Sequence, residues 1–445
     1  MPNSVFINQK INYFKKKINI SGDKSLSIRW ALLASQALGK SRAYNLLKSE
    51  DVLSTLDCLK KLGTEIKIKK NFCEINGMGL NSFKFKKGLV INAGNSGTLG
   101  RLILSLLIKS PYKIKLIGDK SLSKRDFSRV INPLKEFGAN FFPKNKKTLP
   151  LYIQGTEFLR PIKYHEKKGS AQIKSSIMLG ALNTPGTTKI IACKSRDHTE
   201  ILFKYLKIPL KIKKNKKFDF IEVKGKKNFK YFNYNIPSDI SSSAYFIVLT
   251  LLSKKSTLII KNVNVNPSRT GSIDILNKMG AKIIIKNKKN YKGEQIGDIY
   301  VKSVKSLKAI NCPTKYNSAA IDEFLIIFLV AARAKGISYF KDLAELNQKE
   351  SPRLKLGSKI LNMIGIKTKL TNHSIKIYGQ PSLDLKKSYE IKNYLKDHRI
   401  FMMATIAALT FGGNWKIHDS NSIKTSFPLF LKLIKKLGGK LNWKN

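Results

Sequence analysis

One short pattern recurs six times along the 445-residue chain and constrains the fold more than any other feature. In each copy a helical stretch ends in an apolar residue and a glycine, and a β-rich run follows. Glycine ends a helix well because it adopts the left-handed conformation that other residues avoid. The helix-ending residues, 69 to 85 positions apart, are Gly63, Gly138, Lys207 (in a weaker copy), Gly280, Gly365 and Gly438. Near-constant spacing of six copies predicts six equivalent α/β units.

The first copy shows the physical basis of the pattern. Leu53, Leu56 and Leu59 recur at helical spacing, which predicts a helix with one buried face. The run Thr64–Ile68 then alternates polar and apolar residues, as a half-buried strand does. A chain of this length is too long for one ordinary core. We therefore expect two α/β (α+β) domains of three units each, joined near Pro237, where the pattern is interrupted.

Composition and cysteine use favour a soluble cytoplasmic protein. Apolar residues make up 42% of the chain, enough for a sizeable core. The four cysteines have no metal-ligand spacing and are not needed as disulfide staples in a chain of this size. The N-terminus lacks the apolar segment of a signal peptide, and runs such as Phe324–Ala332 are too short to span a bilayer. We expect no membrane association.

The formal net charge of +56 permits two interpretations. A nucleic-acid-binding protein would use such an excess to contact phosphates. Alternatively, the chain reflects a composition bias, since it is rich in Lys, Ile and Asn together and its lysines are spread along its whole length. No nucleic-acid-reading motif is present, so we favour the bias and expect no nucleic-acid partner. The charge would still attract an anionic substrate.

The hexapeptide Gly-Asp-Lys-Ser-Leu-Ser occurs twice, at Gly22–Ser27 and Gly118–Ser123. An arginine follows each copy at the same offset, Arg29 and Arg125. A glycine turn, small hydroxyls and cations just before a helix offer N–H groups and positive charge to an anion. An ordinary loop remains the alternative for each copy taken alone. The repetition with a matched arginine favours an anion site.

A glycine-rich stretch, Asn92–Arg101, precedes another apolar helical run. Glycines there would let the backbone approach a ligand closely. The stretch matches neither a Walker A loop nor a dinucleotide-binding pattern. A plain strand-to-helix connection remains the alternative.

Three charged segments in the second half of the chain are candidates for chemistry. Around Glu350, a helical conformation would place Lys349 and Arg353 on one face, which would suit a carboxylate engaged in proton transfer; a salt-bridged surface turn is the alternative. The segment Asp397–Arg399 opens an apolar helix and resembles an anion site. The segment Ile321–Glu323 places two acids before a buried run, with helix capping as the competing explanation.

Taken together and in order, these segments resemble the family of 5-enolpyruvylshikimate-3-phosphate (EPSP) synthases across nearly the whole chain. Each segment is moderately specific, and the ordered set is highly specific. The matching segments are Gly22–Arg29, Asn92–Arg101, Gly118–Arg125, Ser170–Ser175, Ser195–Glu200, Pro237–Ser243, Asn266–Gly271, Ile321–Glu323, Lys349–Arg353, Asp397–Arg399 and Ser426–Pro428.

The resemblance implies a fold and a reaction. The family fold has two similar domains, each with three βαβαββ units arranged as an inside-out α/β barrel. It implies a discontinuous domain of residues 1–21 and 237–445, a continuous domain of residues 22–236, and an active site in the cleft between them. The family transfers the enolpyruvyl group of phosphoenolpyruvate to the 5-hydroxyl of shikimate 3-phosphate, on the route to chorismate and the aromatic amino acids. It uses no metal or organic cofactor, and we expect a monomer.

The resemblance also implies roles for individual residues. Those expected to bind shikimate 3-phosphate are Lys24, Ser25, Arg29, Ser170, Gln172, Ser195, Asp322 and Lys349. Those expected to bind phosphoenolpyruvate are Lys24, Gly97, Arg125, Gln172, Arg353 and Arg399. Asp322 would accept the 5-hydroxyl proton and Glu350 would serve the methylene carbon, with Lys24 as a rival for proton delivery. His398 and Asp239 would support the site. Gly97 keeps the small residue typical of sensitivity to the inhibitor glyphosate.

Three positions depart from the usual family pattern. Pro352 stands before Arg353 and would alter the turn that aims it. Thr425, next to Lys424, stands where some members place a lysine that binds phosphoenolpyruvate. His198 stands where some members use a tyrosine against the substrate. The related UDP-N-acetylglucosamine enolpyruvyl transferases are a rival family, but their reactive cysteine is missing from the matching stretch.

Overall fold

The computed structural model describes residues 4–444, which form two compact units. Unit 1 contains the described residues up to Ser21, then Pro237–Asn290 and the chain from Gln295 onward. Unit 2 contains Gly22–Ile236 and the short segment Tyr291–Glu294. The sequence-based division assigned this last segment to the other domain. Each unit has its own hydrophobic core.

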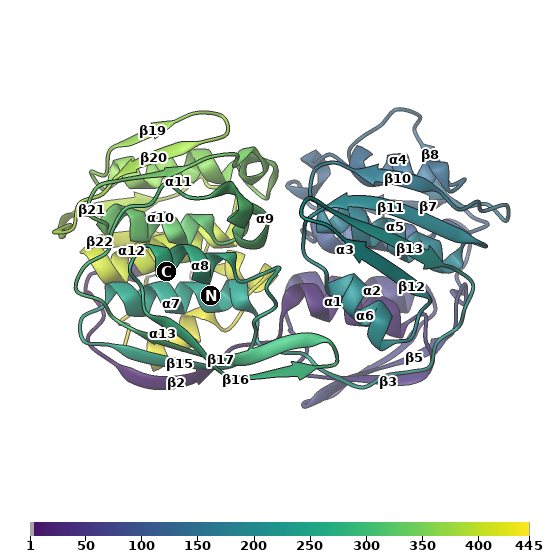
Figure 1. Cartoon of the computed structure of the whole chain (residues 1–445), viewed down its shortest axis with the longest axis horizontal. Helices are drawn as coiled ribbons and strands as arrows, with labels where there is room; N and C mark the ends of the chain where they lie inside the picture. The colour runs from purple at the N-terminus through teal and green to yellow at the C-terminus, as the bar shows by residue number, and fades with distance from the viewer. Residues whose placement is uncertain (1–3, 445) are drawn as a thin grey trace. The chain divides into compact units, whose positions relative to one another are not determined.

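Unit 2 is built from three βαβαββ repeats that form three four-stranded sheets (Figure 1). The sheet orders are β14-β3-β5-β4, β6-β7-β9-β8 and β10-β11-β13-β12. The first repeat contains α1 (Lys24–Ala34), β3 (Leu38–Tyr44), α2 (Glu50–Lys61), β4 (Glu65–Ile68) and β5 (Phe72–Met78). The second contains β6 (Val90–Asn92), α3 (Gly97–Leu106), β7 (Ile114–Ile117), the 3-10 helix η1 (Leu122–Lys124), α4 (Ser128–Glu136), β8 (Asn140–Phe142) and β9 (Leu151–Gln154). The third contains β10 (Lys163–Glu166), α5 (Ala171–Asn183), β11 (Thr187–Cys193), α6 (His198–Tyr205), β12 (Leu210–Lys214) and β13 (Phe218–Lys224), and β14 (Tyr234–Asn235) follows.

Unit 1 repeats this architecture with sheets ordered β16-β17-β15-β2, β18-β20-β19 and β21-β22-β1-β23. The first repeat contains α7 (Ile240–Leu252), β15 (Thr257–Asn264), α8 (Gly271–Lys278), β16 (Ile283–Tyr291) and β17 (Glu294–Lys302). The second contains η2 (Thr314–Tyr316), α9 (Asn317–Ala320), α10 (Phe324–Arg333), β18 (Ile337–Phe340), η3 (Ala344–Gln348), α11 (Arg353–Met363), β19 (Thr368–Leu370) and β20 (Ile375–Tyr378). The third contains β21 (Leu385–Ile391), α12 (His398–Phe411), β22 (Gly412–Ile417), η4 (Ser420–Thr425), α13 (Phe430–Lys436) and β23 (Asn442–Lys444), and is completed by the N-terminal β1 (Ser4–Ile7).

Two strands are exchanged between repeats. The strand before α1, β2 (Lys15–Asn19), pairs in parallel with β15 in unit 1. The strand before α7, β14, pairs in parallel with β3 in unit 2. Each therefore completes the sheet of the other's repeat, and the chain passes from one unit to the other next to each strand.

The sheets of each unit surround buried helices (Figure 1). In unit 1, every residue of α7 and α12 is buried, as are Phe324–Ala332 of α10. Helices that are apolar on all sides can be stable only in such a position. In unit 2, α1, α3 and α5 take the same place. The predicted burial of the run Phe324–Ala332 is confirmed.

The helix-ending glycines have the conformation that the repeat predicts. Gly63, Gly138, Gly280, Gly365 and Gly438 all have φ between 84° and 116°. Lys207, the exception in the weak third copy, also has a positive φ of 55°. All six copies therefore end their helices in the same way. No helix among residues 4–444 has the length and apolarity needed to cross a membrane.

Candidate active site

In both units, predicted site residues lie where helices begin. In unit 2, Lys24 is the first residue of α1, Gly97 is the first of α3, and Gln172 is the second of α5. In unit 1, Arg353 begins α11, and Arg399 is the second residue of α12. A helix N-terminus exposes backbone N–H groups and carries partial positive charge. Each unit therefore gathers groups that can bind an anion.

The two cations of α1 are held by polar partners in unit 2. Lys24 Nζ donates to Asp51 Oδ2 at 2.9 Å. Arg29 is only 5% exposed and donates from Nε to Thr199 Oγ1 and from Nη2 to Ser175 Oγ, both at 2.9 Å. Buried partners of this kind fix the orientation of a guanidinium group. The first hexapeptide thus forms a helix start, as predicted, with Asp23 as its N-cap.

The second hexapeptide folds differently from the first. It leads into the short 3-10 helix η1, and α4 begins only at Ser128. Arg125 follows η1 directly, and its Nη2 donates to Asn95 Oδ1 at 3.3 Å and to Ser121 Oγ at 3.4 Å. Unlike the first copy, the second copy therefore does not lead directly into an α-helix. Arg125 is nevertheless directed toward the glycine-rich stretch.

The glycine-rich stretch begins α3 and contacts α5. Ser96 caps the helix, and Gly97 is its first residue. Arg101 Nη1 donates to Gln172 Oε1 at 2.7 Å, and Gln172 Nε2 donates to Thr98 Oγ1 at 3.0 Å. A Cβ atom on Gly97 would lie 2.9 Å from Nη1 of Arg101 and Nη1 of Arg125. The glycine thus lies against two guanidinium groups.

The predicted serines of unit 2 have three different environments. Ser25 lies in the first turn of α1 and is partly exposed. Ser170 caps α5 and accepts from the Ile173 N–H at 3.4 Å. Ser195 Oγ is buried and makes no hydrogen bond among residues 4–444. A buried hydroxyl without a partner is unusual in a native protein, which fits a group that waits for a ligand.

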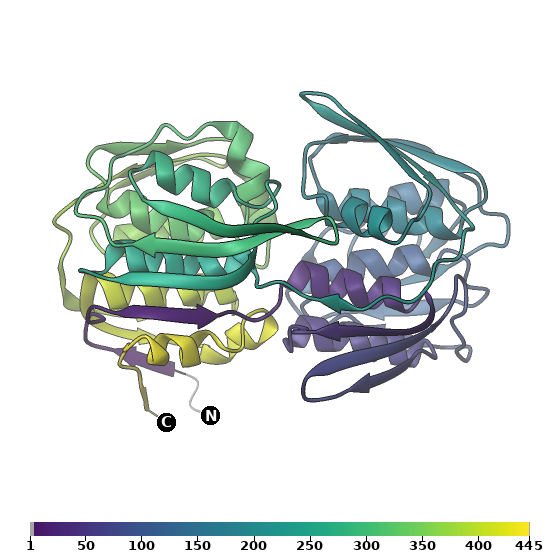
Figure 2. The ribbon, with the colours of Figure 1, turned by 60° about the horizontal axis from the view of Figure 1, so that its bottom comes forward.

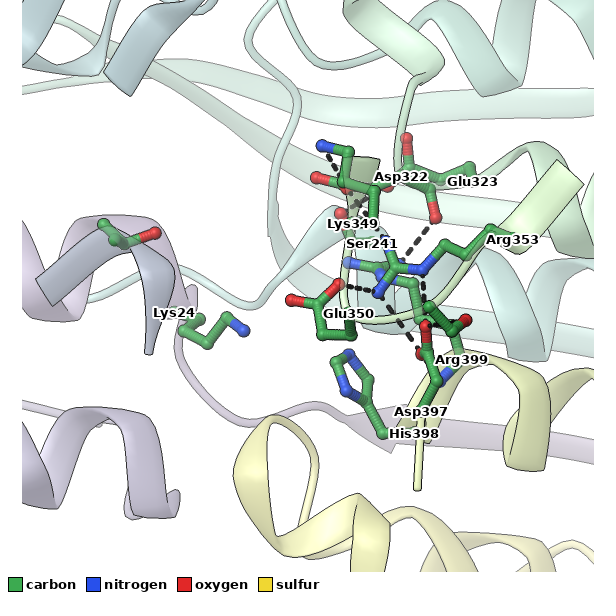
Figure 3. Close-up of polar contacts among 12 residues, drawn as sticks. Lys24, Ser241, Asp322, Glu323, Lys349, Glu350, Arg353, Asp397, His398 and Arg399 are labelled. Atoms are coloured by element: carbon green, nitrogen blue, oxygen red, sulfur yellow. Dashed lines mark hydrogen bonds and ion pairs between the residues drawn. The ribbon is translucent and has the colours of Figure 1, made fainter. Parts of the chain in front are cut away.

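The charged cluster of unit 1 is centred on Arg353, which is 1% exposed (Figure 3). Its Nε donates to Asp397 Oδ2 at 2.9 Å, its Nη2 donates to Glu350 Oε2, and its Nη1 lies 3.5 Å from Asp322 Oδ1. Lys349 Nζ lies 3.3 Å from the same Asp322 oxygen. Two predicted acids and two predicted cations are therefore in direct contact.

The local conformation around Glu350 differs from the predicted helix. Lys349 is extended, with φ −86° and ψ −155°, and α11 begins only at Arg353. Pro352 explains this start, because a proline disfavours the helical conformation of the residue before it. Glu350 still reaches Arg353, so the ion pair forms across a turn rather than along a helix.

Electrostatics hold the cluster in its charged form. Burial alone would raise the pKa of Asp397, but the neighbouring Arg353 guanidinium keeps that pKa below its ordinary value. Burial alone would lower the pKa of Arg399, but the nearby Asp322 carboxylate raises it above its ordinary value. Arg399 Nη1 also donates to the Asp322 carbonyl oxygen at 2.7 Å. The charged forms of Asp397 and Arg399 are therefore stabilised by neighbouring opposite charges despite their burial.

Two further residues of unit 1 had been assigned supporting roles. Asp239 caps α7 by accepting from the N–H groups of Ser241 and Ser242 at 2.7 and 3.2 Å. His398 begins α12, and its Nδ1 lies 3.3 Å from Thr425 Oγ1. Asp239 is a structural cap in this arrangement.

The sequence did not predict several of the contacts that hold the candidate site residues. Glu323, next to Asp322, is fully buried and accepts from Ser241 Oγ, and its side chain does not cap α10. Asp397 is the buried partner of Arg353, and Asp51 is the partner of Lys24. Only a contact seen in space identifies these partners, since they lie 27 or more positions away from the residue they hold.

No group of three or more His, Cys, Asp or Glu residues suited to hold a metal ion is found within residues 4–444.

His198, which stands where some family members use a tyrosine, has a buried side chain. It is 1% exposed, and its Nδ1 lies 2.6 Å from Glu294 Oε1.

Comparisons with known proteins agree with this geometry. The family model described as EPSP synthase (3-phosphoshikimate 1-carboxyvinyltransferase) matches residues 8–434. A 3-phosphoshikimate 1-carboxyvinyltransferase of Ruthia magnifica is 38% identical over 443 residues, covering 99% of this chain and all of that protein. The chain belongs to the EPSP synthase family.

Solved structures support the same conclusion. The structure of EPSP synthase from Acinetobacter baumannii has a TM-score of 0.86 at 32% identity and covers 99% of this chain and all of its own. The enolpyruvyl transferase NikO from Streptomyces tendae has a TM-score of 0.77 at 13% identity, covering 100% of this chain and 99% of its own, and so shows the fold alone. The predicted fold class, an enolpyruvyl transferase fold with six repeats, is confirmed.

Membership of the EPSP synthase family makes the chain an enzyme of the shikimate pathway. Enzymes of this family transfer the enolpyruvyl group of phosphoenolpyruvate to shikimate 3-phosphate. Both substrates are phosphorylated anions, in keeping with the cations gathered at the helix starts. The prediction of this activity from the sequence is confirmed.

Proposed function

We propose that the two clusters carry out EPSP synthesis with the roles expected for the matching positions. The residues proposed for shikimate 3-phosphate are Lys24, Ser25, Arg29, Ser170, Gln172, Ser195, Asp322 and Lys349. Those proposed for phosphoenolpyruvate are Lys24, Gly97, Arg125, Gln172, Arg353 and Arg399. The observation that carries the proposal is the charged cluster of unit 1, in which Asp322 contacts Lys349 and Arg353, and Glu350 contacts Arg353.

The reaction needs three proton transfers near two anions. In the proposed mechanism Asp322 takes the proton of the 5-hydroxyl of shikimate 3-phosphate. The oxygen of that hydroxyl adds to C2 of phosphoenolpyruvate. A proton is given to C3, by Glu350 or by Lys24, so that the addition balances. Phosphate then leaves from C2, and the group that protonated C3 takes a proton back from it, which restores the methylene group. Fixed cations such as Arg399 offset the substrate charges without reorganising during the reaction.

The proposal is tested by neutralising each acid. Glu350→Gln and Asp322→Asn should each lower kcat by about 10²-fold, the usual scale for a positioned acid or base. Release of phosphate from phosphoenolpyruvate, with and without shikimate 3-phosphate, measures turnover. Asp342→Asn is a matched control, because this residue of unit 1 is exposed and its φ of 56° suits asparagine.

Full activity in both acid variants would reject the assigned roles. Full activity in Glu350→Gln together with its loss in Lys24→Met would instead assign proton delivery to Lys24. Lys24 is a reasonable rival because its ammonium group is held by Asp51 at the start of α1.

We also propose that the enzyme works as a cytoplasmic monomer without nucleic acid. Lysines lie over aromatic rings on several separate sheets, for example Lys115 over Tyr152, Lys286 over Tyr300 and Lys376 over Tyr339. This scatter supports a composition bias rather than one basic stripe. Sedimentation with and without a polyanion tests the monomeric state and the lack of nucleic-acid binding.

A further inference from the structure

The hairpin of β16 and β17 contributes to both units. Its strands pair within the sheet β16-β17-β15-β2 (Figure 2). The tip of the hairpin, Tyr291–Glu294, which includes the end of β16 and the start of β17, belongs to unit 2. The turn is well anchored there. Tyr291 OH accepts from the Asn235 N–H at 2.8 Å, and the Lys292 ammonium lies 5.0 Å from the centre of the Tyr205 ring.

Glu294 makes the most buried polar contact of this turn. Its Oε1 lies 2.6 Å from Nδ1 of His198, and the side chains are 0% and 1% exposed. Packing alone would not need a carboxylate at this position, because burying a carboxylate is unfavourable unless it is paired. The contact therefore fixes the imidazole ring at a defined place.

His198 begins α6, where several proposed substrate groups meet. The next residue, Thr199, accepts from Arg29 Nε at 2.9 Å and lies 2.7 Å from Ser175 Oγ. Ser195, with its unpartnered buried hydroxyl, lies three residues before His198. A shift of the first turn of α6 would therefore move Thr199 and its contact with Arg29, and it would displace the end of the segment that carries Ser195.

The opposite side of α6 is also fixed. Lys174 Nζ of α5 lies 2.6 Å from Glu200 Oε1, with side chains 0% and 5% exposed. This ion pair joins α6 to α5. His198 is thus held from the hairpin side by Glu294.

We propose that Glu294 is a positioning residue for shikimate 3-phosphate, acting through His198 on the segment Ser195–Thr199. The hairpin turn is then part of the binding site without touching the substrate. This inference rests on the proposed assignment of Arg29 and Ser195 to that substrate.

Two variants of Glu294 and one control variant on the same strand test the inference. Glu294→Asp shortens the side chain by one methylene group and should raise KM for shikimate 3-phosphate about tenfold, because small misplacements have such effects. KM for phosphoenolpyruvate and kcat should change less than about threefold. Glu294→Gln keeps an acceptor oxygen and should restore KM to near the parent value.

Asp298→Asn is the matched control. Asp298 is a carboxylate on the same strand, but it accepts from the Asn262 N–H at 2.9 Å and from Asn287 Nδ2 at 2.7 Å, both in unit 1. It should lower the melting temperature without changing either KM. Equal kinetics in Glu294→Asp and Asp298→Asn would overturn the inference.

Arg29→Lys in the same assay separates two statements: that Arg29 binds shikimate 3-phosphate, and that Glu294 positions the binding segment. An unchanged KM for shikimate 3-phosphate in this variant would reject the substrate assignment itself. A raised KM in Arg29→Lys with a parent-like KM in Glu294→Asp would reject only the role of Glu294. If Glu294→Asp does not fold, His198→Gln, which moves the donor away from the Nδ1 position, decides by the same criteria.

Discussion

Asp397 organises three neighbours from the N-terminus of α12. It accepts from the Arg399 N–H at 2.9 Å, from Ser351 Oγ at 2.8 Å and from Arg353 Nε at 2.9 Å. A single carboxylate thus caps a helix and neutralises a buried guanidinium. Its charge state should therefore affect the stability of unit 1.

The pH dependence of stability follows from the direction of this shift. Burial opposes the charge of Asp397, but Arg353 outweighs it and lowers the pKa of Asp397 in the folded state. The carboxylate therefore stabilises the fold above its unfolded pKa, and this contribution is lost as pH falls through the lower, folded value. Asp397→Asn should cost about 3 kcal/mol at pH 7, because it removes the fully buried counter-charge of Arg353.

Melting temperatures measured between pH 7 and pH 3 check this prediction. The difference between parent and Asp397→Asn should shrink toward the acid end. A difference that stays constant over the whole range would contradict it.

Gly97 leaves room for two neighbouring guanidinium groups because it has no side chain. A methyl group there would come within 2.9 Å of the guanidinium groups of Arg101 and Arg125. Gly97→Ala should displace them and raise KM for phosphoenolpyruvate about tenfold, and KM for shikimate 3-phosphate less. It should also weaken inhibition by glyphosate, to which we expect the parent enzyme to be sensitive.

Steady-state kinetics with each substrate varied in turn check the prediction for Gly97. Gly100→Ala, one turn further along α3, is the control, since its methyl group would meet the Phe127 ring at 3.3 Å instead. Equal changes of both KM values in Gly97→Ala would count against the assignment, as would unchanged turnover of the parent enzyme at high glyphosate.

Among the elements, α6 is followed by a different residue type from the other five repeat helices, although the backbone conformation is the same. Lys207 takes the left-handed position with φ 55°, where the equivalent residues are glycine. A residue with a Cβ atom is strained there by about 1–2 kcal/mol. Lys207→Gly should therefore stabilise the protein by about 0.5–1 kcal/mol, after allowing for the greater entropy of glycine in the unfolded chain.

Urea unfolding curves measure this change. Lys204→Gly, within α6 itself, is the control and should destabilise by about 1 kcal/mol, because glycine is unfavourable inside a helix. Destabilisation by both substitutions would show that a contact of the Lys207 side chain stabilises the fold by more than the backbone strain at this residue destabilises it.

The elements also show what the sequence can and cannot predict. The repeat pattern correctly predicted helix ends at Gly63 and Gly365, because glycine conformation is a local property. It did not predict that Pro352 delays the start of α11 or that the second hexapeptide forms a 3-10 helix. The pairing of Glu294 with His198 was beyond any sequence pattern, since 96 positions separate the two residues.

The net charge of +56 is a property of the whole molecule. Many lysines are exposed and lack an acidic partner, since the chain has 84 Lys and Arg residues but only 28 Asp and Glu residues. Like charges at this density repel one another and favour the expanded, unfolded state. Stability should therefore depend on ionic strength even where no single ion pair is involved.

The melting temperature should rise by several degrees between about 20 mM and 300 mM NaCl, because the screening length falls below the size of a domain. A matched variant carries eight exposed lysines changed to glutamate, which lowers the net charge from +56 to +40. The positions are Lys16, Lys70, Lys87, Lys216, Lys254, Lys289, Lys305 and Lys440. Repulsion grows with the square of the charge, so the salt-induced rise in the variant should be roughly half that of the parent. An equal rise in both proteins would mean that salt acts through hydration or specific binding instead of through the repulsion among these lysines.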